Sequence, residues 1–341
     1  MKVVCVADAY ITPEMMREGV APFLRTEDSL EVLFWGQEDR EAMRETARLL
    51  ETGHRDSLPL PALLPEAVKN ADLLIVHLCP VTGSLLDNAP RLKAVLSCRG
   101  GMENLDVEAA TERGIIVSTN PAHNANAVAE YTLGLMLCET RNICRSHFAL
   151  KNGQWRKVYP NTATSIRELK DLSVGIVGFG SVGRLVAEKL QALGCRILVS
   201  DPFCKDSPYG IVPLDELLRL SDVVTLHARA KGVIIGEREL GLLKPTAVLI
   251  NTARAHLIDT PALKRSLDKG RPLSVALDVF DSEPDIPEFL REYDNVTITS
   301  HRAGDTINSY KDAPSFAIDN YLGYLRGKPL MFWVNKDSLQ K

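Results

Sequence analysis

Four residues whose side chains suit proton transfer and anion binding follow apolar runs of this sequence. Arg254, Asp278, Glu283 and His301 each come after a short run typical of a buried strand. A histidine can give or take a hydroxyl proton near neutral pH, and a carboxylate on its other ring nitrogen fixes its tautomer. A guanidinium binds a carboxylate with its planar fork and can polarise a carbonyl. Together these residue types predict hydride transfer at a carbon that bears oxygen, with a cofactor carrying the hydride.

The stretch that ends on Asp201 predicts the cofactor. A short apolar run meets the pattern G-x-G-x-x-G at Gly178, Gly180 and Gly183, and a helical pattern and a second strand follow. Gly178 permits a tight turn, Gly180 lets the backbone approach a pyrophosphate, and Gly183 lets the helix lie close to the strand. The plainer interpretation, a turn that needs three glycines, does not explain the element order or the acid. Because a carboxylate accepts from ribose hydroxyls and repels a 2′-phosphate, Asp201 favours NAD(H) over NADP(H).

The elements that would position these residues indicate two α/β domains with parallel sheets, because short apolar runs alternate with helical patterns. In a doubly wound sheet, ligands bind beyond the carboxyl ends of the strands. We expect residues 1–120 and 304–341 to form a substrate domain and 121–303 to form a dinucleotide-binding domain, with the site in the cleft and hinges near Asn120 and Ala303. The expected strands are residues 3–7, 31–35, 73–77, 94–97 and 115–118 in the first domain, and 174–177, 196–200, 223–226, 247–251, 274–277 and 296–299 in the second.

Three longer segments complete the pattern. One long helix is expected over about residues 126–150, where Asn152-Gly153 stops it. Trp155–Lys170 is expected to be an irregular arm. Residues 306–325 predict an amphipathic helix that ends before Gly327 and can cross back to the first domain.

Composition excludes several classes of partner. A net charge of −4 gives no reason to expect nucleic acid or an anionic membrane. The N-terminus has no signal-peptide core, and no run of about 20 apolar residues predicts a membrane span. The seven cysteines are scattered without C-x-x-C, and the seven histidines show no paired ligand spacing. We therefore expect reduced thiols, no metal site and a cytoplasmic protein.

Six motifs spread over nearly the whole chain are similar to those of one family. They are Gly178-Phe179-Gly180-Ser181-Val182-Gly183, Asn251-Thr252-Ala253-Arg254, Leu277-Asp278-Val279-Phe280 with Glu283-Pro284, Thr299-Ser300-His301-Arg302-Ala303-Gly304, Cys98–Asp106 and Asn126–Glu130. In this combination the sequence resembles the D-isomer-specific 2-hydroxyacid dehydrogenases, most closely the phosphoglycerate dehydrogenase-like branch, without a segment similar to its C-terminal regulatory domain. The resemblance implies an NAD-binding Rossmann domain, a flavodoxin-like α/β substrate domain, and a homodimer formed through the long helix and its neighbours.

The resemblance also implies roles for single residues. Arg254 would bind the substrate carboxylate and carbonyl, His301 would be the acid/base, and Glu283 would be its partner. Asp278 would lie near the nicotinamide. Substrate would be held by Arg99, Gly100, Gly101, Arg254 and His301, and the cofactor by Gly178, Gly180, Ser181, Val182, Gly183, Asp201, Pro202, His227, Thr252, Ala253, Arg254, Asp278, His301 and Gly304.

Some positions depart from the family pattern. His227-Ala228-Arg229-Ala230 stands where Pro-Leu-Thr is frequent, Ala255 replaces a glycine, Ser300 replaces a proline, and Arg302 replaces a small apolar residue. If Arg99 or Arg302 turned inward, the site would hold more positive charge than a simple 2-keto acid needs, which predicts a second anionic or polyhydroxylated group on the substrate. The alternative is that they reach solvent or pair with local carboxylates such as Glu103 and Asp305.

Two other functions remain compatible with the pattern. One is an NAD-sensing binding protein like the family's transcriptional corepressors, although no interaction tail is evident. The other is a different Rossmann enzyme, such as formate dehydrogenase or adenosylhomocysteine hydrolase. The sequence does not name the 2-hydroxy acid.

Overall fold

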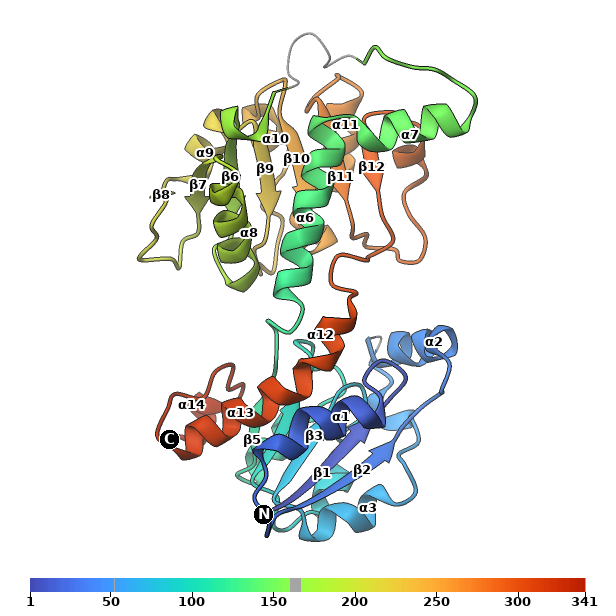
Figure 1. Ribbon diagram of the computed structural model, residues 1–341, viewed down its shortest axis with the longest axis vertical. Coiled ribbons are helices and arrows are strands. Elements are labelled where there is room, and N and C mark those ends of the chain that lie inside the picture. Colours follow the sequence, from blue (N-terminus) through green and yellow to red (C-terminus); the bar gives the residue numbers. More distant parts are fainter. Residues whose placement is uncertain (52, 160–166, 341) are drawn as a thin grey trace. The chain divides into compact units, whose positions relative to one another are not determined.

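The computed structural model describes residues 1–51, 53–159 and 167–340, and it divides into two compact units (Figure 1). The first unit comprises Met1–Asn124 and Thr306–Lys341, and the second comprises Ala125–Asp305. The C-terminal segment therefore returns to the unit that contains the N-terminus. The functions assigned to the two units, and the cleft between them, stay predictions.

The sheet of the first unit has five parallel strands in the order β2-β1-β3-β4-β5. This order is that of flavodoxin-like folds. The strands are β1 Lys2–Ala7, β2 Ser29–Phe34, β3 Leu73–Val76, β4 Ala94–Ser97 and β5 Ile116–Ser118. The central strand β3 is buried along its whole length, which explains its continuous apolar sequence.

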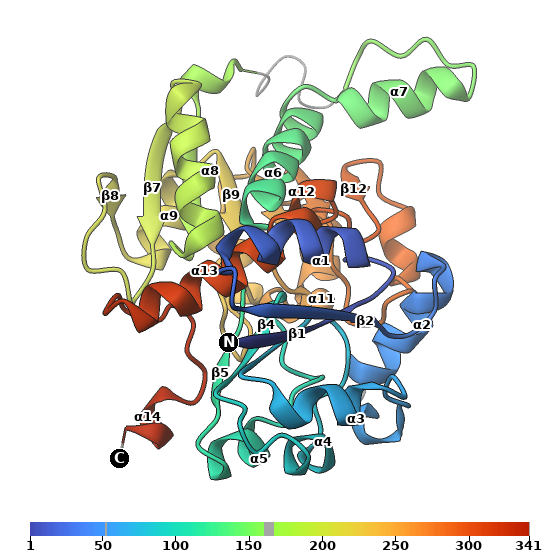
Figure 2. The same ribbon diagram turned by 60° about the horizontal axis from the view of Figure 1, so that its bottom comes forward.

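Helices cover both faces of this sheet, and α1 and α13 lie side by side on one of them (Figure 2). Met16 of α1 and Ile318 of α13 share a buried cluster with Val3 and Ile75 of the sheet. The helices are α1 Pro13–Val20, α2 Arg40–Glu51, α3 Leu64–Ala67, α4 Gly83–Asp87, α5 Val107–Glu112, α12 Ile307–Lys311, α13 Ala313–Leu325 and α14 Lys336–Leu339.

The single C-terminal helix expected from the sequence is two helices. The helix is interrupted at Asp312, which lies between α12 and α13. Pro314 lies in the first turn of α13. Proline has no N–H and would disrupt the interior of a continuous helix, but it fits a first turn. The prediction missed this break because the apolar pattern continues across it.

The sheet of the second unit has seven parallel strands in the order β12-β11-β10-β9-β6-β7-β8. This is the dinucleotide-binding order with one strand added at the β12 edge. The strands are β6 Ser173–Val177, β7 Arg196–Ser200, β8 Gly210–Ile211, β9 Val223–Leu226, β10 Val248–Asn251, β11 Ser274–Leu277 and β12 Val296–Ile298. The expectation of six strands missed β8, which is an exposed pair of residues at the sheet edge.

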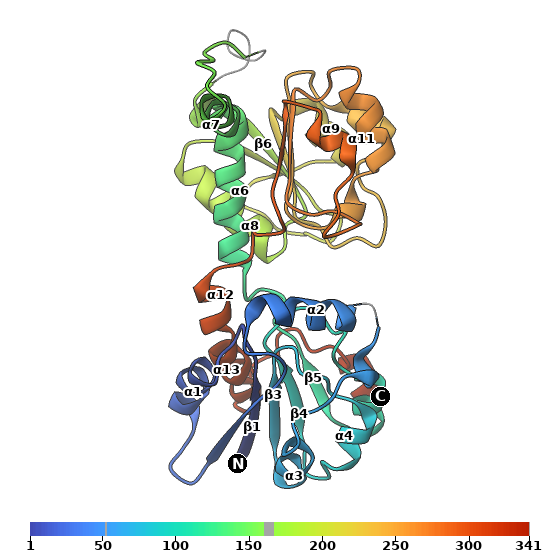
Figure 3. The ribbon, with the colours of Figure 1, turned by 90° about the vertical axis from the view of Figure 1, so that its right-hand side faces the viewer.

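Two helical layers cover this sheet, with α6 and α8 on one face and α9 and α11 on the other (Figure 3). The helices are α6 Ala125–Thr140, α7 Ile143–Lys151, α8 Ser181–Ala192, α9 Leu214–Leu220, α10 Glu237–Leu242 and α11 Thr260–Leu267. Short 3₁₀ turns occur at Ala21–Phe23, Arg55–Ser57, Val68–Asn70, Leu169–Asp171, Ala255–Leu257 and Glu288–Arg291. Across the described ranges, no helix combines the length and apolar content needed to span a membrane.

The long helix expected over residues 126–150 is also two helices, α6 and α7. Asn142 adopts a left-handed conformation, with φ of 55°, and breaks the helix. The buried Arg145 fixes this break: its guanidinium bonds to Glu139, to Asn142 Oδ1 at 2.7 Å and to the Asp294 carbonyl at 2.8 Å. Of the expected arm Trp155–Lys170, residues 160–166 lie outside the described part.

Candidate active site

The register of the second sheet brings the predicted residues to one edge. Val177, Leu226, Asn251 and Leu277 are paired in one row across β6, β9, β10 and β11. Because all strands are parallel, the segments after this row emerge side by side. They carry Gly178, His227, Thr252 to Arg254, and Asp278 to Glu283. His301 follows β12, the neighbour of β11.

His301 and Glu283 form a hydrogen-bonded pair. The ring Nδ1 of His301 lies 2.8 Å from Glu283 Oε2, and the other oxygen of Glu283 accepts from the backbone N–H of Phe280 at 2.8 Å. The Glu283 carboxylate is therefore held from behind while it orients the ring. With Nδ1 committed to Glu283, Nε2 is the nitrogen left for a substrate. His301 has φ of 52°, an unusual conformation that occurs preferentially at functional sites.

Asp278 anchors the loop that carries His301 by hydrogen bonds. This carboxylate is fully buried and accepts from Thr299 Oγ1 at 2.5 Å, from Arg302 N at 2.9 Å and from Ala303 N at 2.8 Å. Its three donors lie on both sides of His301. Asp278 therefore fixes the histidine loop, a role that the sequence did not indicate, and its proximity to a nicotinamide stays a prediction.

Arg254 lies on a segment that is tied to its strand. The amide of Asn251 donates to the Arg254 carbonyl at 2.8 Å and accepts from Ala253 N at 3.0 Å. The Thr252 hydroxyl lies 3.0 Å from the hydroxyl of Thr132 on α6. The Arg254 side chain is exposed, and its Nη1 donates to the Ala253 carbonyl at 2.7 Å. Asn251 and Thr132 position this segment but were not predicted as site residues.

The three glycines of the turn differ in the space that surrounds them. Gly178 has φ of 92°, and a Cβ at this position would lie 2.5 Å from the Ala228 nitrogen. A Cβ on Gly183 would collide with the Gly178 carbonyl, which explains how closely α8 packs on the turn. A Cβ on Gly180 would meet nothing within 4 Å, so this glycine borders open space. Ser181, Val182 and Gly183 begin α8, whose first N–H groups have no acceptor in the helix and no side-chain cap at Gly180.

Asp201 directly follows β7 and lies beside this turn. Its Oδ2 accepts from Phe179 N at 2.7 Å, and its Oδ1 accepts from Phe203 N at 2.8 Å. The carboxylate therefore shapes the glycine turn from the position expected of the ribose-binding acid. Pro202, the next residue, is exposed.

His227 is tied to the neighbouring strands. Its backbone N–H donates to the Val177 carbonyl at 2.7 Å, and its Nε2 lies 2.9 Å from Thr225 Oγ1. Burial lowers the pKa of His227 to about 3, so the ring is neutral at physiological pH.

The predicted substrate loop, Arg99 to Gly101, lies in the first unit after β4. Arg99 N donates to Ser97 Oγ at 3.2 Å, and the Arg99 Nη1 lies 3.3 Å from Glu103 Oε2. Because Arg254 and His301 belong to the other unit, their meeting with this loop around a substrate stays a prediction.

Arg99 and Arg302 each have a local acidic partner, and an extra inward charge from either of them stays a prediction. Arg99 pairs with Glu103, and Arg302 Nη1 lies 2.6 Å from Asp305 Oδ2. These are the local carboxylates of the alternative. Gly304, between Arg302 and Asp305, is partly exposed.

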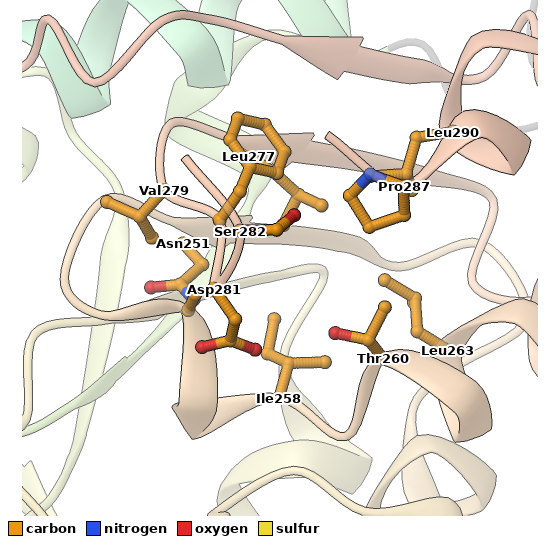
Figure 4. Close-up of a pocket in the computed structure, with 12 residues that line it drawn as sticks. Asn251, Ile258, Thr260, Leu263, Leu277, Val279, Asp281, Ser282, Pro287 and Leu290 are labelled. Carbon is orange, nitrogen blue, oxygen red and sulfur yellow. The ribbon is translucent and has the colours of Figure 1, made fainter. Parts of the chain in front are cut away.

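A cavity of about 180 Å³ lies beside the Glu283 loop in the second unit (Figure 4). Leu263, Pro287 and Leu290 lie together on one side with Thr260 beside Leu263, and Asp281 lies on the opposite side. None of the predicted site residues lines this cavity.

Within the part of the chain that the structure describes, no group of three or more His, Cys, Asp or Glu side chains could hold a metal ion.

Comparison with known proteins accounts for this arrangement. Residues 133–303 match the NAD binding domain model of the D-isomer specific 2-hydroxyacid dehydrogenases. A glyoxylate reductase of Thermofilum pendens is 32% identical over 309 residues, which cover 87% of this chain and 91% of that protein. A D-3-phosphoglycerate dehydrogenase of Methanocaldococcus jannaschii is 36% identical over 81% of this chain, but the match spans only 54% of that longer protein.

A solved structure extends the likeness to the whole fold. The 2-hydroxyacid dehydrogenase of Ketogulonicigenium vulgare Y25 has a TM-score of 0.69 and 26% identity, with 98% of both chains covered. The strand orders of both sheets, the glycine turn and the matched domain thus agree with one another. The chain therefore belongs to the D-isomer-specific 2-hydroxyacid dehydrogenase family, whose members use NAD in the oxidoreduction of 2-hydroxy acids.

Proposed function

We propose that this protein interconverts 2-keto acids and D-2-hydroxy acids, with His301 as the acid/base, Glu283 as its partner and Arg254 as the ligand of the substrate carboxylate. The observation that carries the proposal is the 2.8 Å contact between His301 Nδ1 and Glu283 Oε2. It gives the imidazole a fixed tautomer and a carboxylate that stabilises its charged form, which are the requirements of a general acid in this reaction.

The residues of the glycine turn fit a dinucleotide. The open space beside Gly180 leaves room for a pyrophosphate, and the first N–H groups of α8 can donate to it. Each Asp201 oxygen accepts one N–H and keeps a lone pair for a ribose hydroxyl. When bound, NAD(H) would supply or accept the hydride.

The protein's own contribution is to hold the substrate and move one proton. Arg254 would hold the carboxylate with its planar guanidinium. During reduction, the imidazolium of His301 would give the Nε2 proton to the carbonyl oxygen as it gains negative charge. During oxidation, the neutral ring would take the hydroxyl proton at Nε2, and Glu283 would stabilise the resulting positive charge through Nδ1.

The substrate class follows from the same groups and from the relatives. The Thermofilum pendens relative is named for glyoxylate, which is the smallest acid with a carbonyl next to its carboxylate. The backbone of Arg99, Gly100 and Gly101 is a further proposed contact for the carboxylate. Because the phosphoglycerate dehydrogenase match covers only about half of that protein, its substrate is one member of the panel to test.

We also propose a homodimer, based on the surface of α7 and the segment after it. Phe148, Trp155 and Val158 are 70%, 79% and 78% exposed. Large exposed apolar side chains along this segment support an interaction surface there. A second copy of this chain is the proposed partner.

A cytoplasmic location is likewise a proposal, supported by the seven cysteines, all of which are free thiols.

NADH oxidation with a panel of 2-keto acids tests the function. Glyoxylate, pyruvate, hydroxypyruvate and phosphorylated 2-keto acids should be compared at a fixed NADH concentration. Turnover with at least one of them is the expected result, with a D-2-hydroxy acid as the product of each substrate that gives a chiral product. Tight NADH binding without turnover of any of them would instead favour the NAD-sensing alternative.

A further inference from the structure

The cavity beside the Glu283 loop is a second site at the carboxyl edge of the seven-stranded sheet. Its volume is about 180 Å³, and its lining includes Asn251 and Leu277, the last residues of β10 and β11. Thr260 and Leu263 of α11 lie on one side of it (Figure 4). Because ligands of parallel α/β sheets bind beyond the carboxyl ends of the strands, a cavity in this place is suited to a small ligand.

Most of the cavity wall is apolar. Eight of the twelve lining residues have apolar side chains. Leu263 and Leu290, which lie together on one side, are only 1% and 2% exposed, so they are held by the core packing of this unit. An apolar cavity of about 150 Å³ is large enough to bind benzene. The cavity therefore fits one aromatic ring that carries a short chain.

Two of the polar side chains in the lining are already engaged within the protein. The Asn251 amide bonds to the segment after β10, and the Ser282 hydroxyl donates to the Asp285 carbonyl at 2.9 Å. Among the residues that the structure describes, the Thr260 hydroxyl and the Asp281 carboxylate have no hydrogen-bond or ion-pair partner. These two groups are therefore available to the polar part of a ligand.

The charge of the lining favours a cation. Asp281 is the one charged side chain among the lining residues, and it lies on the side opposite Leu263 (Figure 4). Lys264, which follows Leu263, is paired with Asp268 at 3.1 Å. A positively charged group at the Asp281 end would thus be attracted by an unpaired carboxylate, whereas an anionic group would be repelled.

We propose that this cavity binds a small arylalkylamine, with its aromatic ring against Leu263 and Leu290 and its ammonium group at Asp281. Such a molecule matches the apolar wall, the volume and the single negative charge on the opposite side. None of the residues assigned to the cofactor or to the 2-keto acid lines the cavity. The inference therefore does not depend on the proposed function.

Calorimetric titration of the intact protein with 2-phenylethylamine tests the proposal, and 2-phenylethanol serves as the neutral ligand of the same size. The amine should bind with a dissociation constant of about 1 mM or lower, as expected for a ligand of this size. The alcohol should bind about 3- to 5-fold more weakly, because attraction to an exposed carboxylate is modest. Saturating NADH should leave the dissociation constant of the amine within about 2-fold, since the two sites are separate.

Two substitutions probe the two halves of the cavity. Asp281→Asn should weaken binding of the amine by about 3- to 5-fold and leave binding of the alcohol unchanged. Ala255→Phe, which adds a ring at a lining position, should abolish binding of both. Asp285→Asn is the matched control, because it removes the same charge from an exposed residue of the same loop whose side chain does not line the cavity. It should leave both dissociation constants unchanged.

The proposal would be overturned if the amine showed no binding at about 10 mM, or if NADH displaced it. Equal binding of amine and alcohol, or an Asp281→Asn protein that binds the amine as the unsubstituted protein does, would also overturn it. Asp281 has no partner to lose among the described residues, so this variant keeps the fold and decides the test even if Ala255→Phe does not fold.

Discussion

Asp278 Oδ1 accepts a hydrogen bond of 2.9 Å from the backbone N–H of Arg302, the residue directly after His301. The same buried carboxylate accepts from Thr299 and Ala303, so it binds the loop on both sides of the histidine. The position of the acid/base thus depends on a carboxylate that is itself shielded from solvent. Buried N–H groups without an acceptor are costly, which makes this contact sensitive to substitution.

Asp278→Ala should lower the free energy of unfolding by about 3 kcal/mol, because it leaves two backbone donors and a hydroxyl without their acceptor. Urea denaturation measures this change. Asp281→Ala, an exposed carboxylate on the same loop, is the control and should change stability by less than about 0.5 kcal/mol. Equal effects of the two substitutions would show that the loop does not depend on Asp278.

The strands were the most predictable part of the fold, since their apolar runs are bounded by glycine, proline and polar residues. The strand ends then predicted Arg254, Glu283 and His301, and register brings these segments to one edge. The breaks at Asn142 and Asp312 were missed, because the apolar pattern continues through them and the buried contacts of Arg145 are not visible in the sequence. The support given by Asp278 was missed because its donors are mainly backbone groups.

The arginines illustrate a second limit. The sequence marked Arg99 and Arg302 as unusual, but each pairs with a carboxylate three or four positions away. Only side-chain geometry shows such local pairing. Arg229, noted only as part of a departure, lies beside Arg254, because pairing across two strands decides this proximity.

Asp201 should control the choice of cofactor. Asp201→Ala is expected to weaken NADH binding by about 1–3 kcal/mol, because a charged acceptor for the ribose and for Phe179 N is lost. NADPH binding should improve relative to NADH, since repulsion of the 2′-phosphate is relieved. Fluorescence titration of both cofactors measures this ratio. If the unsubstituted protein bound NADPH as tightly as NADH, the assignment of Asp201 as the residue that selects NADH would be contradicted.

Arg145→Ala should destabilise the protein by about 3–5 kcal/mol, because Glu139 would remain buried without its partner. Burial raises the pKa of Glu139, against the opposing charge of Arg145. Because the folded protein favours the protonated form of Glu139, the contribution of this group to the free energy of unfolding should fall as pH rises. The Arg145→Ala variant should therefore be destabilised more at pH 8 than at pH 5. Denaturation at both pH values provides the measurement. Addition of Glu139→Gln should recover part of the loss, and no recovery would refute a charge-based cause.

His227 should make the protein less stable in acid. Its folded pKa of about 3 lies below the ordinary value of 6.5, so the unfolded chain binds the proton more readily. Stability is therefore complete above about pH 6.5 and declines as pH falls toward 3, by at most about 2 kcal/mol from this group at pH 5. Thermal denaturation of His227→Gln should show a smaller loss between pH 7 and pH 5 than the original protein. An identical loss would exclude this histidine as a cause.

Glu283→Gln should keep the fold and restrict keto-acid reduction to lower pH, because the imidazolium of His301 loses its stabilising charge. The pH profile of kcat/KM tests this expectation. Glu288→Gln, an exposed carboxylate farther along the loop, should leave the profile in place. A Glu283→Gln profile that coincides with the original would mean that the 2.8 Å contact has no part in proton transfer.

The most direct test of the account is the turnover of His301→Ala with its best 2-keto acid, measured together with NADH binding. Loss of the proton donor should lower kcat by about 10²- to 10⁴-fold. The NADH dissociation constant should stay within about 2-fold of the original, because the phosphate and ribose contacts are assigned to the glycine turn and Asp201. Unchanged kcat in a folded His301→Ala protein would contradict the assignment of His301 as the acid/base.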